Sequence, residues 1–317
     1  MAPSSSGQDT ALSRQRQGFE PPWGRFLSYL DKGGRMSVRN PVAAGQFYEG
    51  TDKGLNLQIE KCFMHKIGVG KLPEVNSAGE RKILGLVSPH AGYVYSGPVA
   101  SHGFYQLARD GIPENVIILG PNHQGMGNTI AISTLDSWQT PLGNIDINRE
   151  LAEKIKAGYS FISFDEKAHM YEHSLEVQVP FLQYLYSDKF KIVPICMMDQ
   201  SLEKAVGIGK AIAKAITGEN VVIIASTDFT HYEPKEMADR KDKLALDYIL
   251  KIDPEGLIGM VDEFEISMCG PGPVATLLTV AKELGANEAN LLKHANSGDV
   301  SGDYGAVVGY ASVVIKR

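Results

Sequence analysis

Histidine follows three uncharged, apolar stretches of this chain, close to the point at which each stretch ends. Such stretches are typical of strands buried on both faces of a parallel sheet, and here they are Ile83–Ser88, Val116–Leu119 and Val221–Ala225. In open α/β sheets, ligands bind beyond the carboxyl ends of the strands. If the three strands are parallel neighbours, His90, His123, Asp228 and His231 lie at one edge of one sheet.

The side chains at this edge suit a transition-metal site. Neutral imidazoles such as those of His90 and His123 bind divalent transition metals well. A third ligand is available from Cys269, Asp228 or His231. Cys269 stands just before a helix that starts at proline, where backbone N–H groups and the helix dipole favour the thiolate over the thiol. A thiolate beside two imidazoles suits iron or copper, and zinc also accepts this set.

Each of these residues also has a plainer interpretation. A histidine at a strand end can hydrogen-bond its own loop, and Asp228 can be a turn acceptor rather than a base or a group that orients a histidine. Agreement among three strand ends favours a shared site. Cys269 with a histidine base would be a nucleophile, so a metal-free cysteine hydrolase is an alternative. The chain has no G-x-S-x-G elbow and no Walker-A or G-x-G-x-x-G motif, which argues against a serine hydrolase and a nucleotide-phosphate cradle.

The segment Glu172–Glu176 (EHSLE) has two interpretations. His173 and Glu176 are one turn apart if a helix has already begun, so both could face the same site. Proline is tolerated without distortion only in the first turn of a helix. The helix that contains Pro180 therefore either kinks at Pro180 or starts after His173. The acids and the histidine would then cap a helix start. The sequence leaves both roles open.

Composition narrows the class of protein. The chain has 317 residues and a net charge of −6, and its slight acidity argues against a nucleic-acid binder. No stretch approaches the roughly 20 apolar residues that a membrane helix needs. Three scattered cysteines do not form a disulfide framework, and we expect a cytoplasmic protein. Residues 1–35 lack sustained periodicity, so we expect a disordered leader or a non-native extension, followed by one domain over residues 36–317.

The rest of the chain alternates predicted strands and helices without an internal repeat. This alternation predicts an α/β fold, a single domain with a mostly parallel central sheet and helices on both faces. Trp138–Leu142 (WQTPL) is predicted to be a loop, and Ala306–Ile315 a long final strand.

Six motifs occur in an order that resembles the Memo family, including the Memo component of prokaryotic AmmeMemoRadiSam gene sets. The motifs begin at Gly45 (GQFY), Pro89 (PHAGY), Gly120 (GPNH), Glu172 (EHSLE), Ser226 (STDFTH) and Met268 (MCG). The resemblance covers the chain from about Val38 to its end.

This resemblance implies a fold similar to that of the class III extradiol ring-cleaving dioxygenases. It places His90, His123 and Cys269 at the metal-binding positions and His231, Asp228 and Cys269 at the catalytic ones. In those dioxygenases the third ligand is a carboxylate. A thiolate is softer and more easily oxidised, so Cys269 at that position argues against ring cleavage. Phe47 stands where animal members carry a tryptophan used in partner binding.

Two hypotheses of different classes follow. The first is a redox protein that depends on iron or copper, with zinc as a further candidate. The second is a non-enzymatic module that reuses the same cleft for a peptide or protein partner. In either case we expect a small molecule or a peptide as the ligand of the cleft. The resemblance also suggests Ammecr-type and radical-SAM proteins as partners, and a homo-oligomer is compatible with it; neither nucleic acid nor a membrane is expected as a partner.

Overall fold

The computed structural model describes residues 37–317, so the expected leader over residues 1–35 lies outside the described residues. The strands are β1 (Val38–Arg39), β2 (Ile83–Ser88), β3 (Asn115–Pro121), β4 (Ile130–Ile132), β5 (Ser137–Thr140), β6 (Gly143–Asp146), β7 (Ser163–Phe164), β8 (Lys191–Met197), β9 (Val221–Ser226), β10 (His231–Glu233), β11 (Glu288–Asn296) and β12 (Val307–Lys316).

The helices alternate with the strands along the chain, as predicted. The α-helices are α1 (Asp52–Met64), α2 (Gly97–Asp110), α3 (Arg149–Gly158), α4 (Val179–Tyr186), α5 (Leu202–Ala215), α6 (Lys235–Ile249), α7 (Pro254–Glu263), α8 (Pro271–Glu283) and α9 (Gly298–Ser301). Two short 3-10 helices, η2 (Glu166–Ala168) and η3 (Glu176–Gln178), precede α4.

The main sheet of the described residues is mixed and largely parallel at its centre, which confirms the predicted α/β class. Its strand order is β10-β12-β2-β9-β3-β8-β4-β7, and β11 pairs with β12. The central pairs β2–β9, β9–β3 and β3–β8 are parallel, whereas β12 joins β2 in the antiparallel sense. The three strands with histidines beyond their ends are therefore parallel neighbours, in the order β2, β9, β3.

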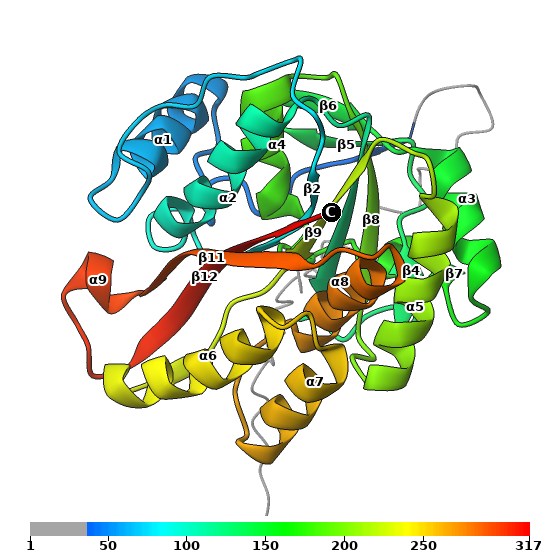
Figure 1. The fold of residues 1–317 in the computed structure, drawn as a ribbon. Helices are drawn as coiled ribbons and strands as arrows, with labels where there is room; N and C mark the ends of the chain where they lie inside the picture. Colours follow the sequence, from blue (N-terminus) through cyan, green and yellow to red (C-terminus); the bar gives the residue numbers. More distant parts are fainter. Residues whose placement is uncertain (1–36) are drawn as a thin grey trace, which may run out of the picture. The chain divides into compact units, whose positions relative to one another are not determined.

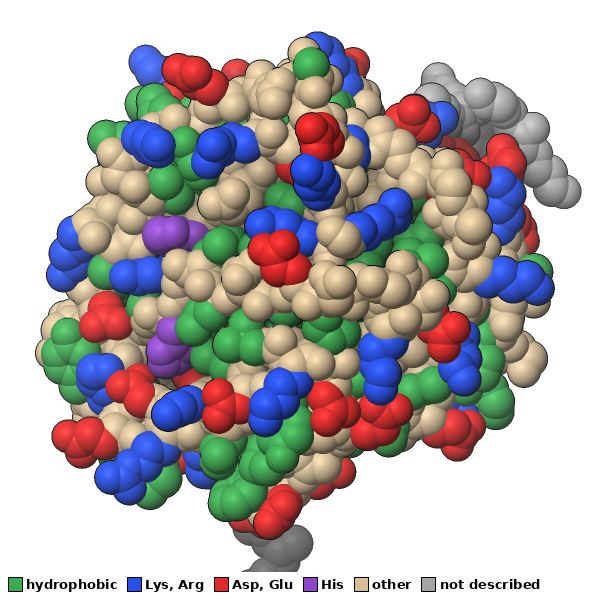
Figure 2. All heavy atoms as spheres, in the orientation of Figure 1, with side chains coloured by type: hydrophobic (Ala, Val, Ile, Leu, Met, Phe, Trp, Pro, Cys, Tyr) green, Lys and Arg blue, Asp and Glu red, His purple; other side chains and the backbone are tan. Residues whose placement is uncertain are grey.

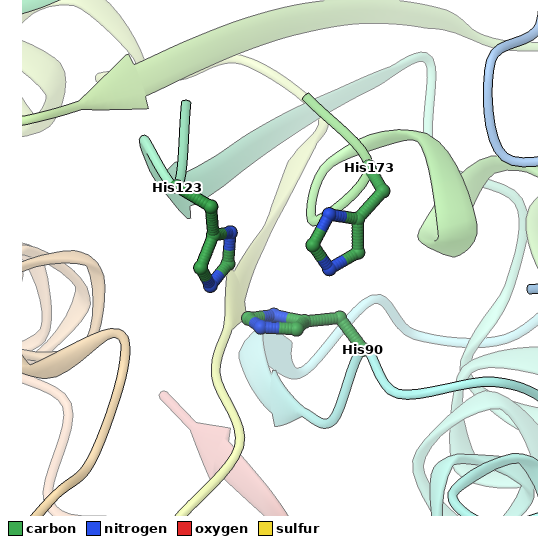
Figure 3. Close-up of side chains that lie close together, drawn as sticks. All are labelled: His90, His123 and His173. Atoms are coloured by element: carbon green, nitrogen blue, oxygen red, sulfur yellow. The ribbon is translucent and has the colours of Figure 1, made fainter. Parts of the chain in front are cut away.

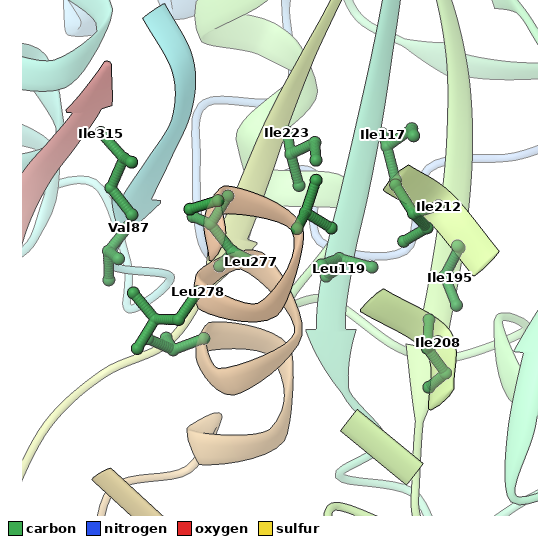
Figure 4. Packing of buried hydrophobic residues seen from close by; sticks show 14 of the residues in the cluster. Val87, Ile117, Leu119, Ile195, Ile208, Ile212, Ile223, Leu277, Leu278 and Ile315 are labelled. Carbon is green, nitrogen blue, oxygen red and sulfur yellow. The ribbon is translucent and has the colours of Figure 1, made fainter. Parts of the chain in front are cut away.

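Helices cover both faces of the main sheet because its central strands are apolar on both sides. β2 contributes to two cores: Leu84 and Val87 join one, and Ile83 and Leu86 join the other. A register shift in the pairing with β12, between Ile315 and Lys316, interrupts the strict alternation at this end of β2. The first core packs against α5 and α8, as Figure 4 shows, and the second packs against α1, α2 and α4. In Figure 1 these two groups of helices lie on opposite sides of β2 and β9.

A second, smaller sheet corrects one sequence prediction. Trp138–Leu142 is not simply a loop, because β5 pairs parallel with β1 and antiparallel with β6. The Trp138 side chain is buried, and its indole nitrogen donates to Ser133 Oγ at 3.1 Å. The strand pairs with a segment about a hundred residues earlier, so its stability depends on tertiary contacts that local periodicity does not contain.

Close contact between Gly309 and α6 gives a testable prediction. A Cβ at Gly309 would lie 1.9 Å from Asp242 Oδ2. Asp242 is buried and cannot move freely, because it accepts from Thr230 N at 2.9 Å and pairs with His294 Nε2 at 2.8 Å. We expect Gly309→Ala to lower the free energy of unfolding by roughly 1–3 kcal/mol through overpacking, measured by urea titration.

The matched control is Gly259→Ala, since a Cβ at Gly259 in α7 would meet nothing within 4 Å. A helical glycine replaced by alanine in open space is neutral or slightly stabilising. Equal effects of the two substitutions would contradict the packing argument.

Candidate metal centre

The strand ends meet as predicted. β2, β9 and β3 are parallel and adjacent, and His90, Asp228 and His123 each stand two residues beyond the end of one of these strands. All three therefore lie at the same edge of the sheet, where α/β proteins bind ligands.

Three imidazoles converge at this edge, those of His90, His123 and His173. One ring nitrogen of each lies within 4.8 Å of one ring nitrogen of the other two. The ring centroids are 5.1 Å apart for His90 and His123, 5.5 Å for His90 and His173, and 4.7 Å for His123 and His173. Figure 3 shows the rings pointing toward a common space. His173, whose role the sequence left open, thus belongs to the cluster.

The buried carboxylate of Glu172 orients His123. Glu172 Oε1 lies 2.9 Å from His123 Nδ1, and Oε2 accepts from the His123 backbone N–H at 2.6 Å. A carboxylate accepts, so His123 donates from Nδ1, and Nε2 is the ring atom left to bind a metal. Burial alone would raise the pKa of Glu172, but the hydrogen bond and charge of His123 hold it at about 2. The carboxyl is therefore ionised and keeps His123 oriented.

Ser226 orients His90 in the same way. Its hydroxyl donates to Ser174 O at 2.6 Å, which uses its one proton. The contact of 2.9 Å between Ser226 Oγ and His90 Nδ1 must then have the imidazole as donor, and His90 Nε2 carries the lone pair. Burial, reinforced by the charge of His123, holds the pKa of His90 well below its usual value. His90 is therefore a neutral imidazole, and its Nε2 lone pair faces Cys269 Sγ at 3.1 Å.

His173 is held by aromatic stacking. The Phe47 ring stacks on it with centroids 4.2 Å apart, and His173 Nδ1 lies 3.4 Å from Glu172 Oε1. Burial, followed by the charge of His90, lowers the pKa of His173 to about 4. His173 lies before η3 and α4 begins only at Val179, so the helix starts after His173, the second of the two arrangements that Pro180 allowed.

Cys269 lies at the border of the histidine cluster. Its Sγ is 3.1 Å from His90 Nε2 and accepts from Asp228 N at 3.1 Å. Burial, followed by the charge of Asp228, raises the pKa of the Cys269 thiol. This shift is opposite to the one expected from its place before α8, because burial outweighs the helix dipole. Without a metal ion, burial thus favours the thiol. The thiolate and the role of Cys269 as a ligand stay predictions, because a bound metal would itself stabilise the thiolate.

The other two predicted catalytic residues lie beside the cluster without joining it. Asp228 is buried, Oδ1 accepts from the His90 backbone N–H at 2.8 Å, and burial raises the pKa of its carboxyl. His231 opens β10, and its Nδ1 lies 2.8 Å from Ser267 O. A carbonyl only accepts, so His231 donates from Nδ1.

The donor set fits a transition metal. Three neutral imidazoles suit zinc, copper and iron, and hydrogen bonds from the ring N–H groups to a carboxylate and a hydroxyl are the usual support for such ligands. His90, His123 and His173 therefore could hold a metal ion. Sequence reasoning missed Glu172 as the partner of His123 and did not assign His173. The available signal was a carboxylate next to a histidine in the EHSLE motif.

The fold and this edge of the sheet define an α/β protein with a histidine cluster that could hold a metal. The model of the family described as Memo-like protein matches residues 39–314. The chain belongs to the Memo family.

Similar chains include MEMO1 family proteins of three organisms. That of Methanopyrus kandleri is 47% identical over 281 residues, which are 88% of this chain and 99% of the relative. That of Methanothermobacter thermautotrophicus is 48% identical over 276 residues, or 86% and 99% of the two chains. That of Sulfurisphaera tokodaii is 47% identical and covers 87% and 98%.

A solved structure of an uncharacterized protein from Escherichia coli K12 is similar to this chain with a TM-score of 0.43. It is 14% identical and covers 64% of this chain and 86% of its own. Among the described residues, no helix is both long and apolar enough to cross a membrane.

Proposed function

We propose that this protein is a metal-dependent redox protein that binds iron or copper through His90, His123 and His173. The observation that supports this proposal is the convergence of three imidazoles with nitrogens within 4.8 Å of one another. His90 and His123 have their second ring nitrogen occupied by Ser226 and Glu172. Bound iron or copper would supply one-electron chemistry and activation of dioxygen or of a polar substrate.

The remaining residues would hold and move protons around a bound substrate. Asp228 has a raised pKa and therefore a greater affinity for a proton than an exposed carboxyl. His231 Nδ1 lies 2.8 Å from Ser267 O, so Nε2 is the ring atom that would exchange a proton with a substrate. Cys269 Sγ, 3.1 Å from His90 Nε2, would serve as a further ligand or as an oxidisable thiol.

One observation favours a second candidate, a module that binds a peptide or protein in this cleft. Val94 is 62% exposed, Tyr95 43% and Tyr232 78%. Exposed aromatic residues are typical of interfaces. Under this proposal the partners would be Ammecr-type and radical-SAM proteins, or a second copy of the chain, in the cytoplasm.

Elemental analysis of protein purified without oxygen and without chelator tests the first candidate. We expect near-stoichiometric iron or copper in the wild type and little of either metal in His123→Ala. We also expect the metal-loaded wild type to be active in a screen of oxidisable small molecules. His65→Ala is the matched control, because His65 Nδ1 accepts from the Ile67 backbone N–H in its own loop and is not part of the histidine cluster. A wild type that stays empty when iron, copper and zinc are offered would contradict the proposal and favour the binding module.

A further inference from the structure

A cavity of about 750 Å³ lies far from the histidine cluster. Its walls are residues 71–76 of the α1–β2 connection, the last turns of α2, the start of β2 and the end of β12. The histidine cluster follows the opposite end of β2, and a strand of six residues spans about 20 Å. The cavity is therefore separate from the candidate metal centre.

Four cationic side chains line this cavity, those of Lys71, Lys82, Arg109 and Lys316. They come from a loop, a helix and two strand ends, so the folded chain gathers them from four places. In Figure 2 lysine and arginine side chains surround the place where β12 ends in Figure 1. The chain as a whole has a net charge of −6, so this local excess of positive charge is not a consequence of composition.

Two of the four cations have no acidic partner among residues 37–317. Lys71 Nζ and the Arg109 guanidinium lie 5.1 and 5.9 Å from the centroid of the same Tyr105 ring. The other two cations, by contrast, pair with carboxylates, Lys82 with Glu80 and Lys316 with Glu288. Lys71 and Arg109 therefore lie beside the same ring without a carboxylate among the described residues to neutralise them, and both would attract an anion bound in the cavity.

The acids that line the cavity do not neutralise these two cations. Asp110 is occupied by Arg81 Nη1 at 2.6 Å and by the backbone N–H groups of Lys82 and Ile83, each at 2.9 Å. Glu74 is exposed and has no ion pair within the described chain. The positive charge of Lys71 and Arg109 thus remains available to a ligand.

The connection that carries Lys71 is fixed in place. It has no helix or strand between Met64 and Ile83, and long connections of this kind in compact domains often carry function. Asn76 N donates to Ala108 O and Arg81 N to Asp110 O, both at 2.8 Å. These bonds satisfy carbonyls at the end of α2 and hold the loop against the helix.

We propose that this cavity binds a small phosphate-bearing anion of the size of a nucleoside phosphate. Its volume is in the range of small-molecule pockets. Lys71 and Arg109 would bind the phosphate groups with charge-assisted hydrogen bonds, and Lys82 and Lys316 would add positive potential. Leu72 and Val75, 45% and 39% exposed, provide the apolar surface for a ring. In this site the phosphate groups would be bound by cationic side chains rather than by the backbone of a glycine-rich loop.

The test is calorimetric titration of the full chain with ATP and with inorganic triphosphate at low and at higher salt. We expect wild-type binding that weakens as salt is raised, and a dissociation constant at least about tenfold higher in the double variant Lys71→Ala/Arg109→Ala. The matched control is Lys251→Ala/Arg240→Ala, because Lys251 Nζ also lies 5.1 Å from a tyrosine ring, that of Tyr248.

Each outcome decides the proposal. The absence of binding of either probe, or equal affinity in the Lys71/Arg109 variant and the control, would overturn the site. Tighter binding of ATP than of triphosphate supports a nucleoside phosphate as the ligand. Equal affinity for the two probes overturns the proposal that Leu72 and Val75 bind a ring. Thermal unfolding of both double variants shows that they fold, since all four substituted side chains are on the surface.

Discussion

Replacing His173 with alanine is expected to lower the affinity for iron or copper by more than about 100-fold. Loss of a group that only supports a metal ligand costs about 10–100-fold, and loss of a ligand should cost more. His173 is a ligand in our proposal because its ring nitrogen lies within 4.8 Å of those of His90 and His123. Competition with a chelator of known affinity, carried out without oxygen, measures the change.

Two variants make this experiment decisive. Glu172→Gln keeps the shape of the side chain that orients His123 but removes its charge, and we expect a loss within the 10–100-fold range. Cys269→Ala tests the ligand set that the resemblance implies. A greater loss in Cys269→Ala than in His173→Ala would contradict the three-histidine centre and favour His90, His123 and Cys269.

The sequence was sufficient to predict the sheet edge. β2, β3 and β9 are short apolar runs that end at polar turns, so each could be recognised from its own residues. That they are parallel neighbours was the condition of the prediction, and the structure meets it. His90, His123 and Asp228 were placed correctly for this reason, because each lies directly beyond a recognisable strand.

His173 could not be assigned in the same way, since it lies outside any strand or helix. Its position depends on stacking with Phe47, a contact between segments far apart in the sequence. The protonation of Cys269 likewise depends on the folded surroundings of its thiol. The helix dipole can be read from local sequence, but burial against Asp228 is a property of the folded site.

The smaller sheet shows the same limit. β5 is four residues long, and Gln139 and the nearby Pro141 weaken its strand pattern. Its pairing with β1 is stabilised by Arg39, whose guanidinium lies 4.3 Å from the centroid of the Trp138 ring. Such a cation–aromatic contact depends on tertiary structure, so no window of sequence contains it.

Arg39 also makes the ion pair on which we expect the stability of the domain to depend most. Its Nη1 lies 2.6 Å from Glu176 Oε2, and the two side chains are only 4% and 1% exposed. Arg39 also donates to His169 O and Glu172 O at 2.9 and 2.8 Å. The carboxylate of Glu176 is thus the charge partner of a guanidinium that cannot reach water.

Removal of this carboxylate, in Glu176→Ala, is expected to lower the free energy of unfolding by about 3–5 kcal/mol, because it leaves a buried, unpaired cation. Glu176 also accepts from Ala43 N at 2.9 Å and from the Tyr48 hydroxyl at 2.6 Å, and these bonds would be lost as well. Urea unfolding measures the change. The control is Glu255→Ala, whose ion pair with Lys282 is about half exposed and should contribute about 1 kcal/mol or less.

Glu176 also connects stability to the candidate metal centre. The loop that it holds between Ala43 and Tyr48 carries Phe47, and Phe47 stacks on His173. A Glu176→Ala protein that is still folded at low urea should therefore bind metal more weakly than the wild type, by less than the loss in His173→Ala. Unfolding energies that are equal in Glu176→Ala and Glu255→Ala would show that the buried pair does not hold this loop. A Glu176→Ala protein that is clearly destabilised but binds metal as tightly as the wild type would show that His173 keeps its place without this support of the Phe47 loop.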